Sequence, residues 1–192
     1  MRCLSCQKWS LAAICEACHR RLLQPTVSTR RIGSLDVVSL FRYRNIEPFL
    51  LSKHTPAGYR IYRYFGKRHI APFLEAFAEG LEEPARLLAI DESVRSGYSH
   101  TALLAHPGRF GKLRPLHGVL RARNPVSYAG KSLRFRLENP RDFVYTGPFD
   151  IPVVLLDDIV TTGSTLSEAR KVLEAHGVEV LFALTLADAR ER

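Results

Sequence analysis

One short segment, residues 153–165, constrains the fold of this chain more than any other. Its first four residues, Val153–Leu156, are apolar and branched, and they run into the adjacent carboxylates Asp157 and Asp158. A continuous apolar run is typical of a strand that is buried on both faces, as in a parallel sheet. A hydroxyl-rich turn around Gly163 follows, and residues 166–176 have the pattern of an amphipathic helix. The segment therefore predicts a strand, a tight turn and a helix.

The predicted turn has the chemistry of an anion site. Gly163 permits a backbone conformation in which several N–H groups point inward, beside the partially positive N-terminus of the helix. Four hydroxyl side chains surround this glycine: Thr161, Thr162, Ser164 and Thr165. Hydroxyls and backbone N–H groups together bind phosphate oxygens, while Asp157 and Asp158 are placed to accept hydrogen bonds from sugar hydroxyls or to hold hydrated Mg²⁺. A phosphate site beside a diol site indicates a sugar-phosphate ligand.

The block resembles the phosphoribosyl pyrophosphate (PRPP) motif of type I phosphoribosyltransferases over its whole length. That resemblance implies that Asp157 and Asp158 contact the ribose hydroxyls, that the turn wraps the ribose phosphate, and that Mg²⁺ accompanies PRPP. The candidate PRPP-binding residues are Asp157, Asp158, Ile159, Val160, Thr161, Thr162, Gly163, Ser164 and Thr165. The alternative is an ordinary strand and turn whose polar residues only cap the next helix.

The rest of the chain reads as strands that alternate with helices. Strands are expected at residues 35–43, 86–91, 115–120, 143–145, 153–156 and 178–186. Helices are expected at residues 48–53, 70–81, 99–105 and 166–176, with Gly177 as a C-terminal cap. This alternation predicts an α/β fold with a parallel sheet flanked by helices, of the type I phosphoribosyltransferase kind by the resemblance above. Ligands of such sheets bind beyond the carboxyl ends of the strands, where Asp157 and Gly163 fall.

All four cysteines lie near the start of the chain, in two Cys-x-x-Cys pairs: Cys3, Cys6, Cys15 and Cys18. Each pair aims two thiolates at one ion, and two pairs complete a tetrahedral site of four sulfurs. Four protein ligands leave no open position, so the expected role is a structural Zn²⁺. His19 is adjacent, and we expect it to face solvent rather than to replace a cysteine. The alternative is a set of redox-active or incidental thiols without metal.

Length and composition set the domain organisation. A chain of 192 residues with 46% hydrophobic content can hold one sizeable core and a small accessory module. We predict a zinc-binding module at residues 1–30 and the phosphoribosyltransferase-like domain at residues 31–192. No apolar run approaches the roughly 18 residues that span a bilayer, and the chain opens on cysteines rather than on an apolar leader. These features favour the cytoplasm, where reduced thiols suit a metal.

Charge is unevenly distributed. Residues 93–137 contain no Asp or Glu but nine basic residues, against a formal net charge of +9 for the whole chain. Aromatic residues are interspersed, and residues 59–68 form a second basic and aromatic stretch. Basic side chains displace counterions from single-stranded nucleic acid and rings stack on its bases. The candidate DNA-binding residues are Arg121, Arg123, Tyr128, Lys131, Arg134, Phe135 and Arg136. The alternatives are a solvated basic face or a loop that only neutralises pyrophosphate.

The cysteine pairs, the basic window and the PRPP motif together resemble the ComF family of late competence proteins, in particular its epsilonproteobacterial ComFC-type members. Residues 95–100, the Arg136-x-x-Asn139 stretch and Lys53 also resemble segments of that family. The resemblance implies a role in natural transformation, in which the protein binds single-stranded DNA and PRPP and helps DNA cross the inner membrane. It also implies a location in the cytoplasm or at the cytoplasmic periphery of that membrane, near the DNA-uptake machinery.

The sequence departs from the family pattern at several positions, so it does not decide whether the protein catalyses phosphoribosyl transfer. Ser99 and His100 stand where Asn-Gln is usual, and Tyr128 stands where glutamine is common. The turn after the strand at 86–91, expected to hold pyrophosphate, contains Asp91 and Glu92, which would repel a diphosphate unless Mg²⁺ bridges them. Three hypotheses follow: a DNA-uptake factor, a phosphoribosyltransferase of nucleotide metabolism, and a PRPP-sensing scaffold without turnover. No residue stands out as catalytic.

Overall fold

The structure is a computed structural model that describes residues 1–90, 97–107, 110–124 and 133–190. Its centre is a six-stranded sheet in the order β1-β2-β8-β7-β3-β4. The strands are β1 (Ser28–Ile32), β2 (Leu35–Arg42), β3 (Ala85–Ala89), β4 (Leu113–Leu116), β7 (Val153–Val160) and β8 (Val180–Asp188). Only β1 pairs antiparallel, with β2; the other neighbours are parallel. The predicted parallel α/β sheet flanked by helices is confirmed.

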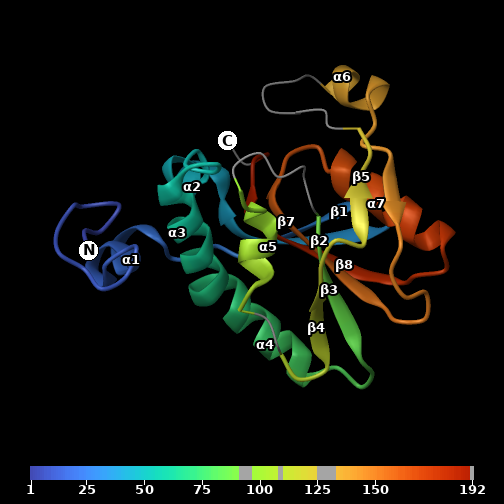
Figure 1. Cartoon of the computed structure of the whole chain (residues 1–192), viewed down its shortest axis with the longest axis horizontal. Helices are drawn as coiled ribbons and strands as arrows, with labels where there is room; N and C mark the ends of the chain where they lie inside the picture. The colour runs from blue at the N-terminus through green and yellow to red at the C-terminus, as the bar shows by residue number, and fades with distance from the viewer. Residues whose placement is uncertain (91–96, 108–109, 125–132, 191–192) are drawn as a thin grey trace.

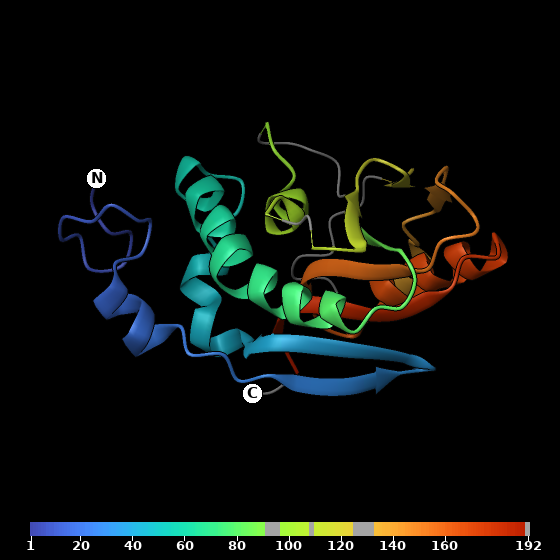
Figure 2. The same ribbon diagram turned by 90° about the horizontal axis from the view of Figure 1, so that it is seen from below.

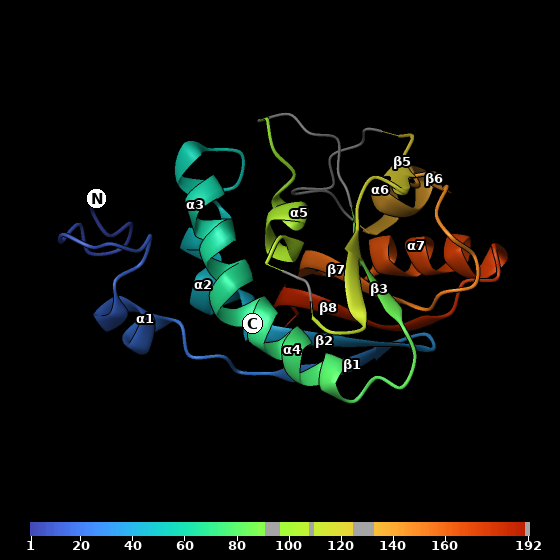
Figure 3. The same ribbon diagram turned by 60° about the horizontal axis from the view of Figure 1, so that its bottom comes forward.

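Helices and a small second sheet cover the two faces of this sheet (Figures 1 and 3). One face carries α2 (Tyr43–Leu50), α3 (Pro56–Phe65), η1 (Gly66–Ile70), α4 (Ala71–Glu79) and α5 (His100–Ala105). The other face carries α7 (Ser164–Ala175) and the antiparallel pair β5 (Leu120–Ala122) and β6 (Phe143–Tyr145), with α6 (Leu133–Glu138) between them in the chain. Two apolar cores therefore sandwich the sheet.

The strand β7 is central because its sequence allows burial on both faces. Val154 and Leu156 belong to the core under α3 and α5, whereas Val153 and Leu155 belong to the core under α7. All four are fully buried, as the continuous apolar run predicts. The strand is longer than the predicted 153–156, since its pairing with β8 continues to Val160↔Asp188. The two carboxylates thus lie within the strand, at its carboxyl end.

Several expected elements differ in the structure. The helix expected at 70–81 is part of a longer helical run that begins at Pro56, because α3, η1 and α4 are continuous (Figure 2). The strand expected at 115–120 is two strands, β4 and β5, separated by Gly118 with φ +71°. The helix expected at 48–53 begins earlier, directly after β2, and contains Pro48. The strand β1 and helix α1 (Glu16–Leu22) were not expected.

The N-terminal segment stands beside the sheet rather than in it. It forms a loop and α1 that lie next to α3 and join the sheet through β1 (Figure 2). Residue 30, the predicted end of the module, lies inside β1. Among the described residues, no helix is both long and apolar enough to cross a membrane.

Candidate functional site

The turn between β7 and α7 lies at the carboxyl edge of the parallel strands. Gly163 is the residue before α7 and has φ +82°, in the left-handed region that an L side chain rarely adopts. A Cβ at this position would lie 2.1 Å from Ile32 Cδ1, so the end of the Ile32 side chain on β1 would have to shift. Glycine is therefore favoured here mainly by the backbone conformation. The twelve-residue helix α7 starts here and directs its N-terminal N–H groups toward the turn.

Hydrogen bonds within the turn, and one from Arg30 on β1, hold the turn in place. The Thr162 hydroxyl donates to Ser164 Oγ at 3.2 Å and accepts from the Ser164 N–H at 3.4 Å. Arg30, on β1, donates from Nη2 to the Thr161 carbonyl at 2.6 Å, and its Nε lies 3.2 Å from Asp188 Oδ2. Arg30 is almost completely buried, and burial lowers its pKa against the opposing effect of Asp188. The turn is thus fixed to the edge of the sheet.

The adjacent carboxylates have different surroundings. Asp157 is half-buried, and its Oδ1 accepts the Asp158 N–H at 2.8 Å. Asp158 is only 5% exposed, and its Oδ2 lies within 3.4 Å of Lys53 Nζ and His100 Nε2. Tyr62 completes the group by donating its hydroxyl to Asp158 Oδ2 at 3.0 Å. Burial opposes ionisation of Asp158, but His100 and Lys53 outweigh it and lower the pKa of this carboxyl.

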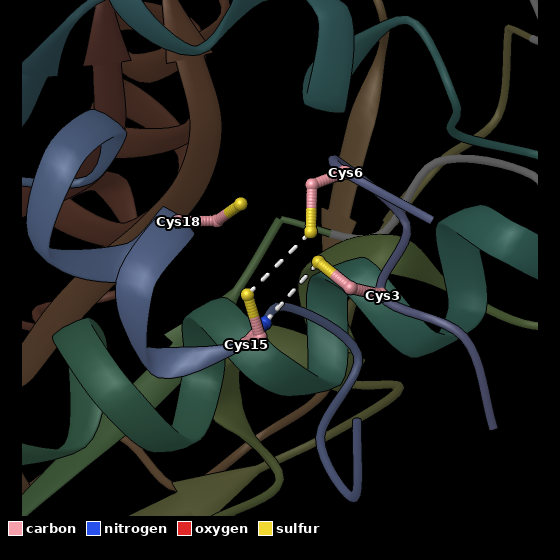
Figure 4. Close-up of side chains that lie close together, drawn as sticks. All are labelled: Cys3, Cys6, Cys15 and Cys18. Carbon is pink, nitrogen blue, oxygen red and sulfur yellow. Dashed lines mark hydrogen bonds between the residues drawn. The ribbon is translucent and has the colours of Figure 1, made fainter. Parts of the chain in front are cut away.

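The four cysteines meet at one point, as the two Cys-x-x-Cys pairs predict. Their sulfur atoms all lie within 4.8 Å of one another and turn toward a common centre (Figure 4). Cys3 and Cys6 come from the N-terminal loop, Cys15 precedes α1 and Cys18 lies on it. Cys6 Sγ and Cys15 Sγ are 3.7 Å apart, close to the about 3.8 Å expected for sulfurs on a tetrahedral zinc with 2.3 Å bonds. The donor set therefore fits a metal ion.

Backbone N–H groups support the thiolates. Cys3 Sγ accepts from the N–H groups of Ser5 at 3.4 Å and Cys15 at 3.3 Å. Burial raises the pKa of Cys3, but hydrogen bonds from the backbone outweigh it and bring the pKa to about 6. A thiol that loses its proton readily is suited to metal ligation.

His19 is half-buried rather than fully open to solvent. Its Nδ1 is 2.8 Å from the Tyr64 hydroxyl, and its ring stacks on His69 with centroids 5.1 Å apart. The side chain thus joins the cysteine module to α3 and η1. Among the described residues, the cluster that could hold a metal ion consists of cysteines alone.

A cavity of about 950 Å³ lies between part of the cysteine module and α3 and η1. Its helical wall carries two tyrosines and four basic residues: Tyr59, Arg60, Arg63, Tyr64, Lys67 and Arg68. The facing wall is residues 10–16, in which Leu11 is fully exposed. Glu16 is the one carboxylate of this lining, and it pairs with Arg68 at 3.2 Å. The lining therefore has a net positive charge beside apolar surface.

The candidate DNA-binding residues of the basic window are only partly described. Arg121 and Arg123 are exposed on and after β5, and Arg134 on α6 pairs with Glu138 at 2.7 Å. Phe135 is half-buried. Tyr128, Lys131 and the side chain of Arg136 lie outside the described residues, as do Asp91 and Glu92. The β5–β6 unit and the cavity wall on α3 belong to opposite faces of the sheet.

Sequence reasoning missed two features of the site. The first is Arg30, which is followed by a second arginine, Arg31, on the strand β1. Because this strand was not predicted, the alternation of its side chains could not show that Arg30 is the buried one. The second is Tyr62, in the basic and aromatic stretch. It lies on the buried face of α3, together with Ile61 and Phe65, and contacts Asp158 there. Reading residues 56–79 as one helix would have placed Tyr62, Phe65 and His69 on one face.

Comparisons with known proteins identify no family for this chain. No family model matches the chain, and no curated protein matches it. Solved structures similar to it include a hypoxanthine phosphoribosyltransferase from Staphylococcus aureus, with 15% identity, a TM-score of 0.43, and coverage of 68% of this chain and 65% of that one. Adenine phosphoribosyltransferase from Trypanosoma brucei has 15% identity and a TM-score of 0.43, with 88% and 78% covered. Orotate phosphoribosyltransferase from Aeropyrum pernix has 17% identity and a TM-score of 0.34, with 90% and 80% covered.

Proposed function

We propose that the chain is a PRPP-binding protein of the type I phosphoribosyltransferase kind. The observation that carries this proposal is the join of β7 to α7, where Gly163 opens the helix and Asp157 lies a few residues upstream at the same edge of the sheet. The ribose phosphate binds to the N–H groups and hydroxyls of residues 161–165, and a ribose hydroxyl donates to Asp157. Mg²⁺ would bind together with the diphosphate and would neutralise part of its charge there.

Calorimetry with PRPP and with inorganic phosphate tests this assignment. Asp157→Ala removes a diol acceptor and leaves the turn intact, so the affinity for PRPP is expected to fall about tenfold or more, while the affinity for phosphate stays unchanged. Asp150→Ala is the matched control, since Asp150 is an exposed carboxylate that precedes the same strand. Equal PRPP affinities in the parent and in Asp157→Ala would remove Asp157 from the site.

A structural Zn²⁺ in the module at residues 1–30 is part of the proposal. The clustered sulfurs and the backbone N–H groups that donate to Cys3 Sγ support it. Zinc ligation couples to folding, so the module and the wall of the cavity that it forms depend on the ion. The metal has no place in transfer chemistry because four protein ligands leave no open position.

The second part of the proposal is a role in DNA uptake, as a protein of the ComF/ComFC kind that acts in the cytoplasm or at the periphery of the inner membrane. The cavity between the cysteine module and α3 favours it. Its cations suit phosphodiesters, and its tyrosine rings and apolar wall suit unpaired bases. An ordinary enzyme of nucleotide metabolism needs neither this cavity nor the module.

Fluorescence anisotropy with a short single-stranded oligonucleotide, at several salt concentrations, tests DNA binding. Replacing Arg60, Arg63 and Lys67 by Gln is expected to reduce the salt slope by about 2, at about 0.7 per phosphate contact.

A parallel variant that neutralises Arg121, Arg123, Lys131 and Arg134 tests the basic window. Truncation of Tyr128 and Phe135 is expected to weaken binding at every salt concentration. If the affinity of the parent protein for the oligonucleotide does not change with salt concentration, the DNA-binding role is contradicted.

Turnover distinguishes the remaining candidate functions. A phosphoribosyltransferase of nucleotide metabolism releases pyrophosphate when PRPP is supplied with its acceptor base, whereas a PRPP-sensing scaffold releases none. A knockout strain tested for transformation, with DNA entry into periplasm and cytoplasm scored separately, tests the role in uptake. Normal entry into the cytoplasm without the protein contradicts it.

A further inference from the structure

A buried arginine on β1 contacts both the central sheet and the candidate phosphate turn. Arg30 donates from Nη2 to the Thr161 carbonyl at 2.6 Å, and its Nε lies 3.2 Å from Asp188 Oδ2. The side chains of Arg30 and Asp188 are both almost completely buried. A guanidinium can make the two contacts at once, because its N–H groups form a rigid, planar fork.

The contact with Thr161 continues the pairing of β7 by one peptide. At the end of β7, the Ala189 N–H donates to the Val160 carbonyl at 2.9 Å, next to the last paired residues of β7 and β8. The next carbonyl along the chain is that of Thr161, and it accepts a hydrogen bond from the side chain of Arg30. The first peptide of the turn is therefore held in one orientation.

This orientation determines where the following N–H group points. The described residues contain no cis peptide bond, and in a trans peptide the carbonyl and the N–H point in opposite directions. Because the Thr161 carbonyl points to the buried Arg30, the Thr162 N–H points away from it. Thr162 is exposed, and within the described part of the chain no residue accepts a hydrogen bond from its N–H. One donor of the turn is thus directed to the open side.

The same face of β1 contacts the turn at a second point. Arg30 and Ile32 are two residues apart on this strand, so their side chains project from one face of it. Ile32 lies against Gly163, the last residue before α7. The two side chains therefore support the turn at its first and at its third residue.

We propose that Arg30 is a positioning residue for phosphate recognition: by holding the Thr161 carbonyl, it directs the Thr162 N–H to an oxygen of the ribose phosphate. This inference rests on the proposed function, because it takes a sugar phosphate as the ligand. The charge of Arg30 is already paired with Asp188, so Arg30 acts through the orientation of the backbone and not as a cation for the phosphate.

Calorimetry with ribose 5-phosphate and with PRPP tests the inference, since both ligands carry the phosphate that the turn binds. The informative variant is Arg30→Met with Asp188→Asn. It removes one positive and one negative charge, so the net charge beside the turn stays the same and only the support of the Thr161 carbonyl is lost. We expect both affinities to fall by a similar factor, about tenfold or more, because a hydrogen bond to a charged phosphate is lost.

Arg31→Met with Asp36→Asn is the matched control. Arg31 is the next residue on β1, and its Nε lies 3.4 Å from Asp36 Oδ1 in an exposed ion pair. This variant also removes one charge of each sign, but it leaves the turn untouched. Both affinities are expected to stay within about twofold of the parent.

The amide signal of Thr162 gives a second test, which needs no variant. In a nuclear magnetic resonance titration of isotope-labelled parent protein, ribose 5-phosphate is expected to shift this signal, because the N–H donates to the bound phosphate. The shift should be lost in Arg30→Met with Asp188→Asn. If that variant does not fold, the titration of the parent decides. A parent that binds the ligand without a shift at Thr162 overturns the inference.

The affinities separate the inference from the proposed function. A parent that binds both ligands, with unchanged affinities in Arg30→Met with Asp188→Asn, overturns the role of Arg30 alone. A loss for PRPP without a loss for ribose 5-phosphate, or an equal loss in the control at Arg31 and Asp36, also overturns it. A parent that binds neither ligand overturns the proposed function and this inference together.

Discussion

Arg30 and Asp188, at opposite ends of the chain, form an ion pair that is closed to solvent: Nε and Oδ2 are 3.2 Å apart, and the side chains are 8% and 6% exposed. Arg30 lies on β1 and Asp188 ends β8, so the pair joins across β2. Because Arg30 also donates to the Thr161 carbonyl, the same guanidinium connects the sheet to the candidate phosphate turn. The strand β1 therefore forms one edge of the sheet and also holds the candidate phosphate turn in place.

Arg30→Met is expected to lower the free energy of unfolding by about 3–5 kcal/mol, because it leaves the Asp188 carboxylate buried without its partner. Denaturant unfolding measures this loss. Arg31→Met is the matched control: Arg31 is the next residue, its side chain is 69% exposed, and its pairing with Asp36 is worth about 0–1 kcal/mol. If Arg30→Met with Asp188→Asn is no more stable than Arg30→Met alone, the unpaired charge is not the cause.

Gly163→Ala combines two costs at the start of α7. The left-handed backbone adds about 1 kcal/mol of strain, and the new Cβ would lie 2.1 Å from Ile32 Cδ1, so that the end of this side chain must also shift. We expect a loss of about 1–2 kcal/mol in thermal unfolding, together with weaker phosphate binding because the turn and Ile32 must adjust to each other.

Gly177→Ala is the matched control at the other end of α7. Its φ is +76° but no atom lies within 4 Å of the added Cβ, so only the strain of about 1 kcal/mol is expected. Adding Ile32→Ala to Gly163→Ala should restore phosphate binding. Equal losses at the two glycines, without rescue, would exclude the contact with Ile32 as the cause.

Metal analysis of protein purified without chelator is expected to give one Zn²⁺ per chain. Cys3→Ser with Cys18→Ser should abolish this and unfold the N-terminal module, which limited proteolysis of residues 1–30 detects. Gln24→Ala is the control, since Gln24 is an exposed residue of the same segment that is not part of the cysteine cluster. A zinc content far below one per chain in the parent contradicts the structural zinc.

The sequence predicts those parts of this fold whose signals are local. The β7–α7 block, the cluster of four cysteines and the C-terminal cap of α7 are all confirmed; at the cap, the Val178 N–H bonds to the Leu173 carbonyl at 3.0 Å and the Gly177 N–H to the Glu174 carbonyl at 2.9 Å. Each depends on residues within a few positions of one another, so spacing and residue type are sufficient.

The remaining features depend on contacts between distant segments. The sequence motif does not distinguish Asp157 from Asp158. Asp158 is the buried one because α3 and α5 pack against its side of β7. The break between β4 and β5 depends on which strand each half joins, β3 or β6. Such choices are made by tertiary packing, which overrides local propensity.

A buried histidine links the cysteine module to the main core and makes stability depend on pH. His69 is 6% exposed, its ring lies against Phe41, Phe65 and His19, and no described residue bonds to its Nε2. Burial, with smaller effects of His19 and Arg68, lowers the pKa of His69 to about 4 from an ordinary 6.5. The folded protein therefore holds this imidazole neutral at neutral pH.

The sign of the effect follows from proton binding. Between about pH 6.5 and about pH 4 the unfolded chain binds a proton at His69 that the folded protein does not, so the free energy of unfolding falls as pH falls, by about 3 kcal/mol in all. Above this window the contribution is fully present, and below it the loss is complete. His69→Phe should remove this part of the slope when denaturant unfolding is measured across the window, since an apolar ring suits these neighbours. His176→Gln, at an exposed histidine, should leave the slope unchanged. Parallel profiles for the parent and His69→Phe would show that another group carries the dependence.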